Sequence, residues 1–216
     1  MTEPAISTRV SELLGVRYPI VQAPMGYIAR AQLASAVSNA GGLGVIETSS
    51  GQLDQVREEI RKMRYLTDNP FGVNIAQLFV RDPAEVVDFV AGEGIGFVTT
   101  SAGDPSVLTT RLHDAGITVF HVVPHLRGAL KAVAAGVDGL VVEGGEGGGF
   151  KQSRDVATMC CCLWSAAQST SLSSLPAGSS TVGRWRPPSC WAPKACRWAP
   201  GWCLPPSPPC TTTGRS

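Results

Sequence analysis

The sequence predicts an α/β protein in which parallel strands alternate with helices along the chain. Up to about position 150, short runs rich in β-branched residues are separated by segments whose apolar residues recur at helical spacing, and glycines mark the boundaries. This alternation is typical of a parallel sheet covered by helices. The strand-like runs are apolar almost throughout, which indicates burial on both faces of the sheet.

Six strands and five helices are predicted, in alternation. The strands cover residues 19–25, 42–48, 71–77, 97–103, 118–124 and 139–145. The helices lie between them, at residues 29–40, 52–66, 83–94, 105–116 and 126–136.

Capping residues support these helix boundaries. Asp82 and Asp104 each precede a proline, and an N-cap carboxylate before proline at the first helical position favours a helix start. Glycines able to adopt a left-handed C-cap stand at the ends of four helices, namely Gly41, Gly94, Gly116 and Gly136.

The predicted strands and helices fit both a doubly wound sheet and a (β/α)8 barrel. No GxGxxG turn follows the first strand, which weighs against a dinucleotide-binding Rossmann fold.

The composition points to no partner beyond small molecules. The chain has 216 residues, 44% of them hydrophobic, and a formal charge of +1, so it can build a core and shows no nucleic-acid or membrane surface. Its first 30 residues lack the features of a secretory signal, and no apolar run approaches the roughly 20 residues that span a bilayer. A soluble cytoplasmic protein is expected.

The C-terminal part has a different composition. Every cysteine and every tryptophan lies after Met159, and the last acidic residue is Asp155. Residues 160–216 are rich in proline and show neither strand nor helix periodicity. A zinc site is disfavoured because this part has no CxxC pair and no histidine, and a disulfide framework is disfavoured without a secretory signal. We therefore expect two parts, residues 1–159 and a disordered tail at 160–216.

A change of reading frame at about Met159–Cys160 explains this tail. When each codon is read from its third base, MCCCLWS is compatible with MVLLPLV, GSSTVGRW with a GGI-x-DGR motif, and CWAPKACRWAPGW with LGAEGVQMGTRM. The shifted text is strand-like and glycine-rich. The alternative is a genuine Cys/Trp/Pro tail that serves an interaction.

Five motifs identify a family resemblance. PIVQAPM, SNAGGLGVI, LTDNPFGVN, VTTSAGDPS and VEGGEGGG, in this order, resemble the nitronate monooxygenases, formerly called 2-nitropropane dioxygenases. They are about equally similar to the related FMN-dependent enoyl-ACP reductases. The resemblance covers roughly residues 8–159 and implies a (β/α)8 TIM barrel that binds FMN. The barrel is incomplete here, with about six βα units followed by an unrelated tail.

The resemblance gives a role to residues at the ends of the first and third strands. Ala23, Pro24 and Met25 end the first strand, where small residues and a proline let the backbone approach a flat ring, although an ordinary turn has the same composition. Asn74 ends the third strand, and its carboxamide offers a donor and an acceptor to a ring edge, or to its own backbone. The resemblance implies that all four contact FMN.

Later strand ends supply further candidates. The loop from Glu143 to Gly149 exposes backbone N–H groups, and the resemblance implies that Glu143, Gly147, Gly148 and Gly149 contact the cofactor. The hydroxyls of Thr100 and Ser101 are candidates for substrate binding, or for capping the next helix. His121 and His125 are candidate proton carriers, with a structural role favoured for both.

One position departs from the family pattern. The histidine that normally follows the glycine-rich stretch and serves as catalytic base is replaced by Phe150. Phenylalanine accepts no proton, so the usual deprotonation of a nitroalkane is lost, with Lys151 and Glu146 as candidate substitutes. An anionic nitronate needs no deprotonation before the flavin oxidises it, so the loss of the histidine does not exclude nitronate oxidation.

The resemblance implies an FMN-dependent oxidoreductase that oxidises alkyl nitronates or nitroalkanes with O2. The alternative is an enoyl-thioester reductase that takes electrons from NAD(P)H, and an alternative of another class is a non-catalytic truncated product. The two FMN phosphate loops of the family occur only in the shifted frame. We therefore expect the chain as written to be unstable and poor in flavin.

Overall fold

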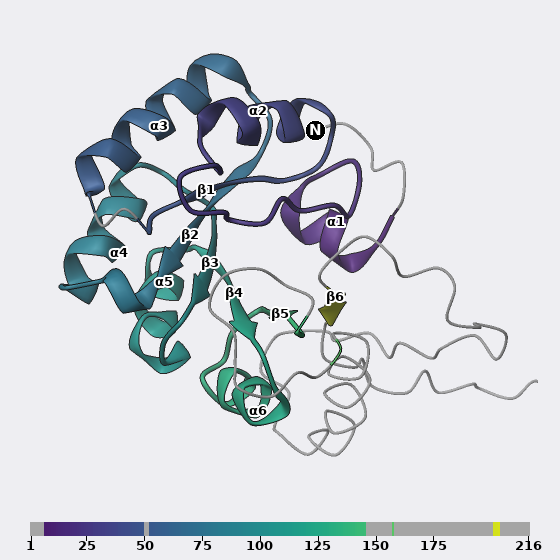
Figure 1. The fold of residues 1–216 in the computed structure, drawn as a ribbon, viewed down its shortest axis with the longest axis vertical. Helices are drawn as coiled ribbons and strands as arrows, with labels where there is room; N and C mark the ends of the chain where they lie inside the picture. The colour runs from purple at the N-terminus through teal and green to yellow at the C-terminus, as the bar shows by residue number, and fades with distance from the viewer. Residues whose placement is uncertain (1–6, 50–51, 146–156, 158–200, 204–216) are drawn as a thin grey trace, which may run out of the picture. The chain divides into compact units, whose positions relative to one another are not determined.

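The computed structural model describes residues 7–49, 52–145, 157 and 201–203 (Figure 1). The chain divides into two units, residues 1–122 with 131–138, and residues 123–130 with 139–216. No helix among these described residues is long and apolar enough to cross a membrane.

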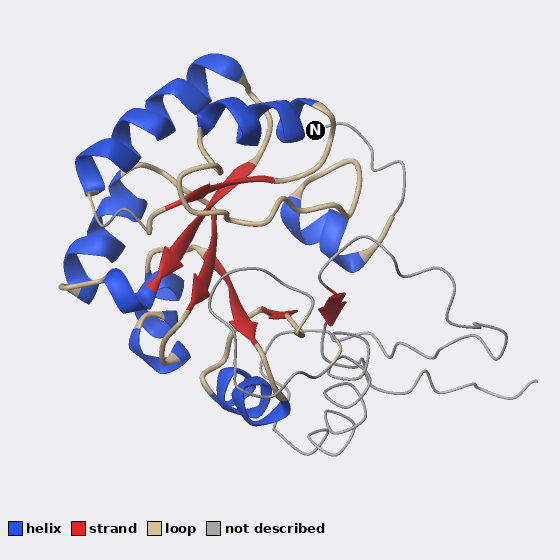
Figure 2. Cartoon of the chain, in the orientation of Figure 1, coloured by secondary structure: helices blue, strands red, loops and turns tan. Residues whose placement is uncertain are grey.

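The first unit contains alternating helices and strands, as the sequence predicts (Figure 2). Its elements in chain order are α1 (Arg9–Leu14), α2 (Ala31–Asn39), β1 (Gly44–Glu47), α3 (Leu53–Leu66), β2 (Phe71–Ala76), the 3-10 helix η1 (Gln77–Phe79), α4 (Pro83–Gly92), β3 (Phe97–Ser101), the 3-10 helix η2 (Pro105–Val107), α5 (Thr109–Asp114) and β4 (Thr118–Val123).

Strands β1 to β4 are parallel neighbours in chain order. Glu47 of β1 pairs with Asn74 of β2, and Asn74 pairs with Thr99 of β3. Thr100 of β3 pairs with His121 of β4. Parallel pairing of consecutive strands through intervening helices is the βα repeat of a barrel, and the predicted α/β class is confirmed.

The predicted first strand, at 19–25, is much shorter than expected. It forms a single parallel bridge, between Val21 and Leu43. Beyond it the backbone bonds to itself, because the N–H of Met25 donates to the carbonyl of Ala23 at 3.0 Å. Pro24 has no N–H to give to a ladder, so the strand ends before it.

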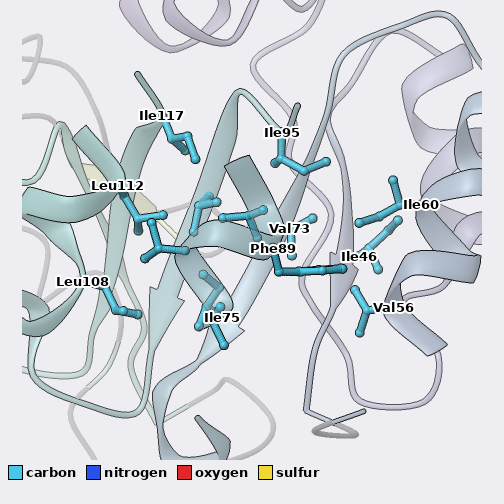
Figure 3. Packing of buried hydrophobic residues seen from close by; sticks show 14 of the residues in the cluster. Ile46, Val56, Ile60, Val73, Ile75, Phe89, Ile95, Leu108, Leu112 and Ile117 are labelled. Atoms are coloured by element: carbon cyan, nitrogen blue, oxygen red, sulfur yellow. The ribbon is translucent and has the colours of Figure 1, made fainter. Parts of the chain in front are cut away.

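The core lies between the strands and their helices. Ile46, Val73 and Ile75 from the strands pack in one cluster with Ile60 of α3 (Figure 3). Val90 of α4 belongs to the same cluster, and each of these side chains is at most 1% exposed. Full burial of one such side chain contributes about 1.5–3 kcal/mol. Because side chains alternate along a strand, this packing assigns Ile46, Val73 and Ile75 to the helix-facing side and their neighbours to the other.

The predicted caps are confirmed. The carboxylate of Asp82 accepts the N–H of Ala84 at 2.8 Å, and that of Asp104 accepts the N–H of Ser106 at 3.1 Å. The glycines at the four helix ends all have positive φ, between 62° and 95° (Gly41, Gly94, Gly116 and Gly136). The predicted helix at 105–116 is divided into η2 and α5.

The second unit holds β5 (Gly139–Val142) and β6 (Gly201–Cys203), and α6 (Leu126–Ala134) begins in it. β5 and β6 are antiparallel, with Leu140 opposite Cys203. Sequence analysis did not anticipate a strand at Gly201–Cys203, because three residues are too few to show a period.

Candidate functional site

Asn74 is held in a buried position near the carboxyl end of β2. It is 4% exposed, and it lies on the side of the sheet away from the helices because its neighbours Val73 and Ile75 face the helix layer. Its Nδ2 donates to Thr99 Oγ1 at 2.9 Å and to Ser101 Oγ at 3.4 Å. These contacts fix the carboxamide of Asn74 beside the hydroxyl of Ser101.

Thr100 and Ser101, which sequence analysis grouped together, face opposite sides of the sheet. Thr100 follows the alternation of Val98, which packs in the helix-facing core, and it is 0% exposed. Its Oγ1 lies 2.7 Å from His121 Nδ1. Only Ser101 therefore shares the side of Asn74.

His121 is a buried, uncharged partner of Thr100. Burial lowers the pKa of its imidazole to about 4, the nearby carboxylate of Asp104 partly opposes this, and the charge of Lys131 adds to it. An imidazole with this pKa is neutral at pH 7 and accepts protons poorly. The structural role favoured for His121 by the sequence agrees with this geometry.

The segment Ala23–Met25 lies after the bridge at Val21. Ala23 is exposed, Pro24 is half-buried and Met25 is 40% exposed. Beside it, the Nε2 of Gln22 donates to the carbonyl of Val45 at 3.1 Å. The segment thus presents small and apolar groups next to an anchored amide.

Two glutamines at strand ends carry buried polar atoms without a partner among the described residues. These atoms are Oε1 of Gln22 and both polar side-chain atoms of Gln77. A buried unsatisfied amide costs on the order of 1–3 kcal/mol, so such groups point to a polar ligand or a solvent molecule. Sequence analysis missed both residues, although each is a polar residue at the end of an apolar strand.

The remaining candidates belong to the second unit. The backbone N–H of Glu143 donates to the carbonyl of Val123 at 3.0 Å, and its side chain is half-buried. His125 Nδ1 accepts the N–H of Gly128 at 2.8 Å, so His125 caps α6. The other predicted positions lie outside the described residues: Glu146, Gly147, Gly148, Gly149, Phe150 and Lys151.

The described part of the site suits a neutral heterocycle better than a metal. No group of three His, Cys, Asp or Glu side chains that could hold a metal ion occurs within the described ranges. Asn74, Gln22 and Gln77 instead provide amide donors and acceptors, the chemistry that the edge of an isoalloxazine ring requires. The donor and acceptor groups of these described residues therefore fit the edge of a flavin ring.

Parallel strands that follow one another in chain order and are covered by helices, with polar side chains near the strand ends, are typical of the (β/α)8-barrel class. Residues 7–86 match the family model described as nitronate monooxygenase. The nitronate monooxygenase of Paraburkholderia phytofirmans is 32% identical, over 70% of this chain and 52% of the relative. The chain is therefore similar to the nitronate monooxygenases, and residues 7–86 carry the match to that family.

Other relatives broaden the range of chemistry in this group. The (3aS,4S,5R,7aS)-5-hydroxy-7a-methyl-1-oxo-octahydro-1H-indene-4-carboxyl-CoA dehydrogenase of Mycobacterium tuberculosis is 34% identical, over 83% of this chain and 50% of its own length. The structure of FabK from Thermotoga maritima is 33% identical with a TM-score of 0.70, over 75% of this chain and 51% of that chain. Nitroalkane oxidase from Streptomyces ansochromogenes is 26% identical with a TM-score of 0.60, over 78% and 59%. The chain spans about half the length of the curated relatives it matches.

Proposed function

We propose that this chain carries the ring-binding part of an FMN-dependent oxidoreductase that oxidises alkyl nitronates with O2. The buried Asn74 carboxamide, fixed by Thr99 and Ser101 on the side of the strands away from the helices, is the observation that carries this proposal. Similarity to the nitronate monooxygenases supports the substrate class.

When bound, the flavin supplies the electron chemistry, and the protein supplies position and electrostatics. Asn74, Gln22 and Gln77 would hold the edge of the ring through neutral amide groups. Ala23 and Met25 would offer small or apolar groups to its face. Ser101 presents a hydroxyl beside Asn74, where it can hold a polar group of the substrate.

Whether the protein has a proton acceptor decides whether its substrate is a nitroalkane or a preformed nitronate. Phe150 occupies the position where the family pattern has a histidine. His121 does not replace it, because it is buried, bonded to Thr100 and has a lowered pKa. A preformed nitronate anion needs no base, so it is the substrate that we propose.

Oxygen uptake tests this choice directly. In the chain with the restored reading frame and bound FMN, we expect oxygen consumption with ethylnitronate at least about a hundredfold above that with neutral nitroethane, since general-base catalysis typically contributes 10²–10⁴-fold. Equal rates with the two compounds would mean that another base is present. No oxygen uptake with either, despite bound FMN, would remove the nitronate assignment.

A second candidate is an oxidoreductase of thioesters. One observation favours it: the relative from Mycobacterium tuberculosis, 34% identical, is named as a carboxyl-CoA dehydrogenase. NADH or NADPH oxidation that depends on crotonyl-CoA would establish this alternative. The absence of such oxidation in a preparation that oxidises ethylnitronate would exclude it.

We further propose that residues 160–216 arise from a change of reading frame near Met159. This part holds every cysteine and tryptophan and no acidic residue. Sequencing across codons 155–165, with the intact mass of the native product, tests the proposal. A frame confirmed as written would instead favour the non-catalytic product, and codon usage typical of coding sequence after Met159 would favour an interaction tail.

A further inference from the structure

Glu47 is a buried carboxylate to which the proposed function gives no role. It is 5% exposed, it is the last residue of β1, and it pairs in register with Asn74. Within the part of the chain that the structure describes, no cationic side chain forms an ion pair with it. A buried charge without a counter-charge must be held by hydrogen bonds.

These hydrogen bonds come from both sides of the carboxylate. Oε1 accepts the backbone N–H of Tyr27 at 3.1 Å. Oε2 accepts the backbone N–H of Ser49 at 2.6 Å and also the hydroxyl of Ser49. The N–H of Glu47 itself donates to the carbonyl of Ala29 at 3.1 Å. Glu47 therefore joins the end of β1 to the turn at residues 26–29.

Tyr27 gives this turn an unfavourable backbone conformation. Its φ is 61°, in the left-handed region that bulky residues rarely adopt. The side chain is 74% exposed, so little packing compensates for the strain. The hydrogen bond from the Tyr27 N–H to the Glu47 carboxylate stabilises this conformation, and hydrogen bonds to charged groups are stronger than neutral ones.

The turn at residues 26–29 also holds the backbone of Met25 in place. The carbonyl of Met25 accepts the N–H of Ala29 at 2.8 Å and that of Ile28 at 3.1 Å. A change at Tyr27 is therefore transmitted to the segment Ala23–Met25 through two backbone hydrogen bonds.

We infer that Glu47 is a positioning residue that holds Tyr27 in its left-handed conformation and so orients the backbone of Ala23–Met25 towards the flavin ring. The link to the flavin rests on the proposed function, whereas the link to Tyr27 does not. Glu47 acts through backbone groups, and no role in proton transfer is assigned to it.

Three variants test this inference, each made in the chain whose reading frame is restored after Met159 as proposed above; that restored chain is the wild type of the comparison. Glu47→Gln keeps the shape of the side chain, but its amide group opposes the N–H donor of Ser49 or of Tyr27. Glu47→Gln combined with Tyr27→Asn is the rescue variant, because asparagine tolerates positive φ better than tyrosine. Glu58→Gln is the matched control, since its carboxylate is 58% exposed and forms a surface ion pair with Arg61.

Two measurements decide the outcome. Amide hydrogen exchange of residues 22–29 should accelerate about tenfold or more in Glu47→Gln, with exchange of β3 unchanged, and return towards wild type in the rescue variant. Riboflavin is the binding probe, because it carries the ring without the phosphate. Its dissociation constant should rise about tenfold in Glu47→Gln and stay constant in Glu58→Gln.

Each alternative result has a definite meaning. Unchanged exchange in Glu47→Gln, or faster exchange that the asparagine does not reverse, would overturn the role of Glu47 in holding Tyr27. Faster exchange with unchanged riboflavin affinity would overturn the link to the ring. Absence of riboflavin binding in the wild type would refute the flavin assignment itself, while the exchange data would still decide the role of Glu47.

Discussion

At the scale of single residues, the buried pair of Thr100 and His121 makes folding stability depend on pH. Burial lowers the pKa of His121 to about 4, against 6.5 for a free imidazole, with Asp104 and Lys131 as the charged groups that act on it. The folded state therefore binds fewer protons than the unfolded state between these values. The contribution of neutral His121 to the free energy of unfolding is therefore fully present above pH 6.5. It is lost as the pH falls towards 4, by up to about 3 kcal/mol. We expect His121→Gln, which keeps a partner for Thr100 but cannot be protonated, to flatten this dependence in urea unfolding at pH 4.5 and 7.5. His113→Gln, at a half-exposed imidazole, is the control, and an equal loss of slope in both variants would contradict the assignment.

At the scale of elements, α3 caps α2. The N–H of Ala31, at the start of α2, donates to Glu59 Oε2 of α3 at 2.9 Å, and Lys62 bonds the other oxygen at 2.8 Å. Burial raises the pKa of Glu59, but the bonds from Lys62 and Ala31 outweigh it and hold that pKa below its usual value. The contribution of the carboxylate is therefore present above its ordinary pKa of 4.5 and is lost as the pH falls below it. We expect Glu59→Gln to lower the free energy of unfolding by about 1 kcal/mol at pH 7, as loss of a helix cap does. Glu58→Gln, on the same helix, should change it by less than about 0.5 kcal/mol in the same urea titration. Equal effects of the two variants would show that the cap contributes nothing.

At the scale of the whole molecule, the reading frame after Met159 determines whether a complete barrel forms. A barrel that lacks its last strands loses pairing partners and interior side chains, and this loss is comparable with the net stability of a domain, about 5–15 kcal/mol. We expect the chain with the restored frame to unfold cooperatively and to copurify with close to one FMN per chain. The chain as written should retain little flavin and aggregate on heating. Absorbance at 450 nm and thermal unfolding measured side by side test this expectation. A written chain that is soluble and yellow would contradict it.

The sequence by itself determined the order and type of most elements. Alternating apolar strands, helical periodicity and caps at Asp82 and Asp104 are local signals, because each depends on residues within one turn or one strand. The family resemblance, and not the strand pattern, made Asn74 a candidate site residue, because an asparagine in this position can also bond its own backbone. The family resemblance, based on short motifs, was likewise visible without the structure, and the comparisons confirm it.

Only the tertiary structure decided which neighbours share a face and which distant groups meet. Thr100 and Ser101 are adjacent in the sequence, yet the packing of Val98 against the helices directs them to opposite sides of the sheet. The bond between Glu47 and Tyr27 joins residues that no local pattern connects. The predicted strand at 19–25 likewise has its β pairing reduced to one bridge, because hydrogen bonding with a neighbouring segment determines strand length. Contacts of this kind depend on which distant segments the folded chain brings together, and the residue pattern of a single segment does not contain that information.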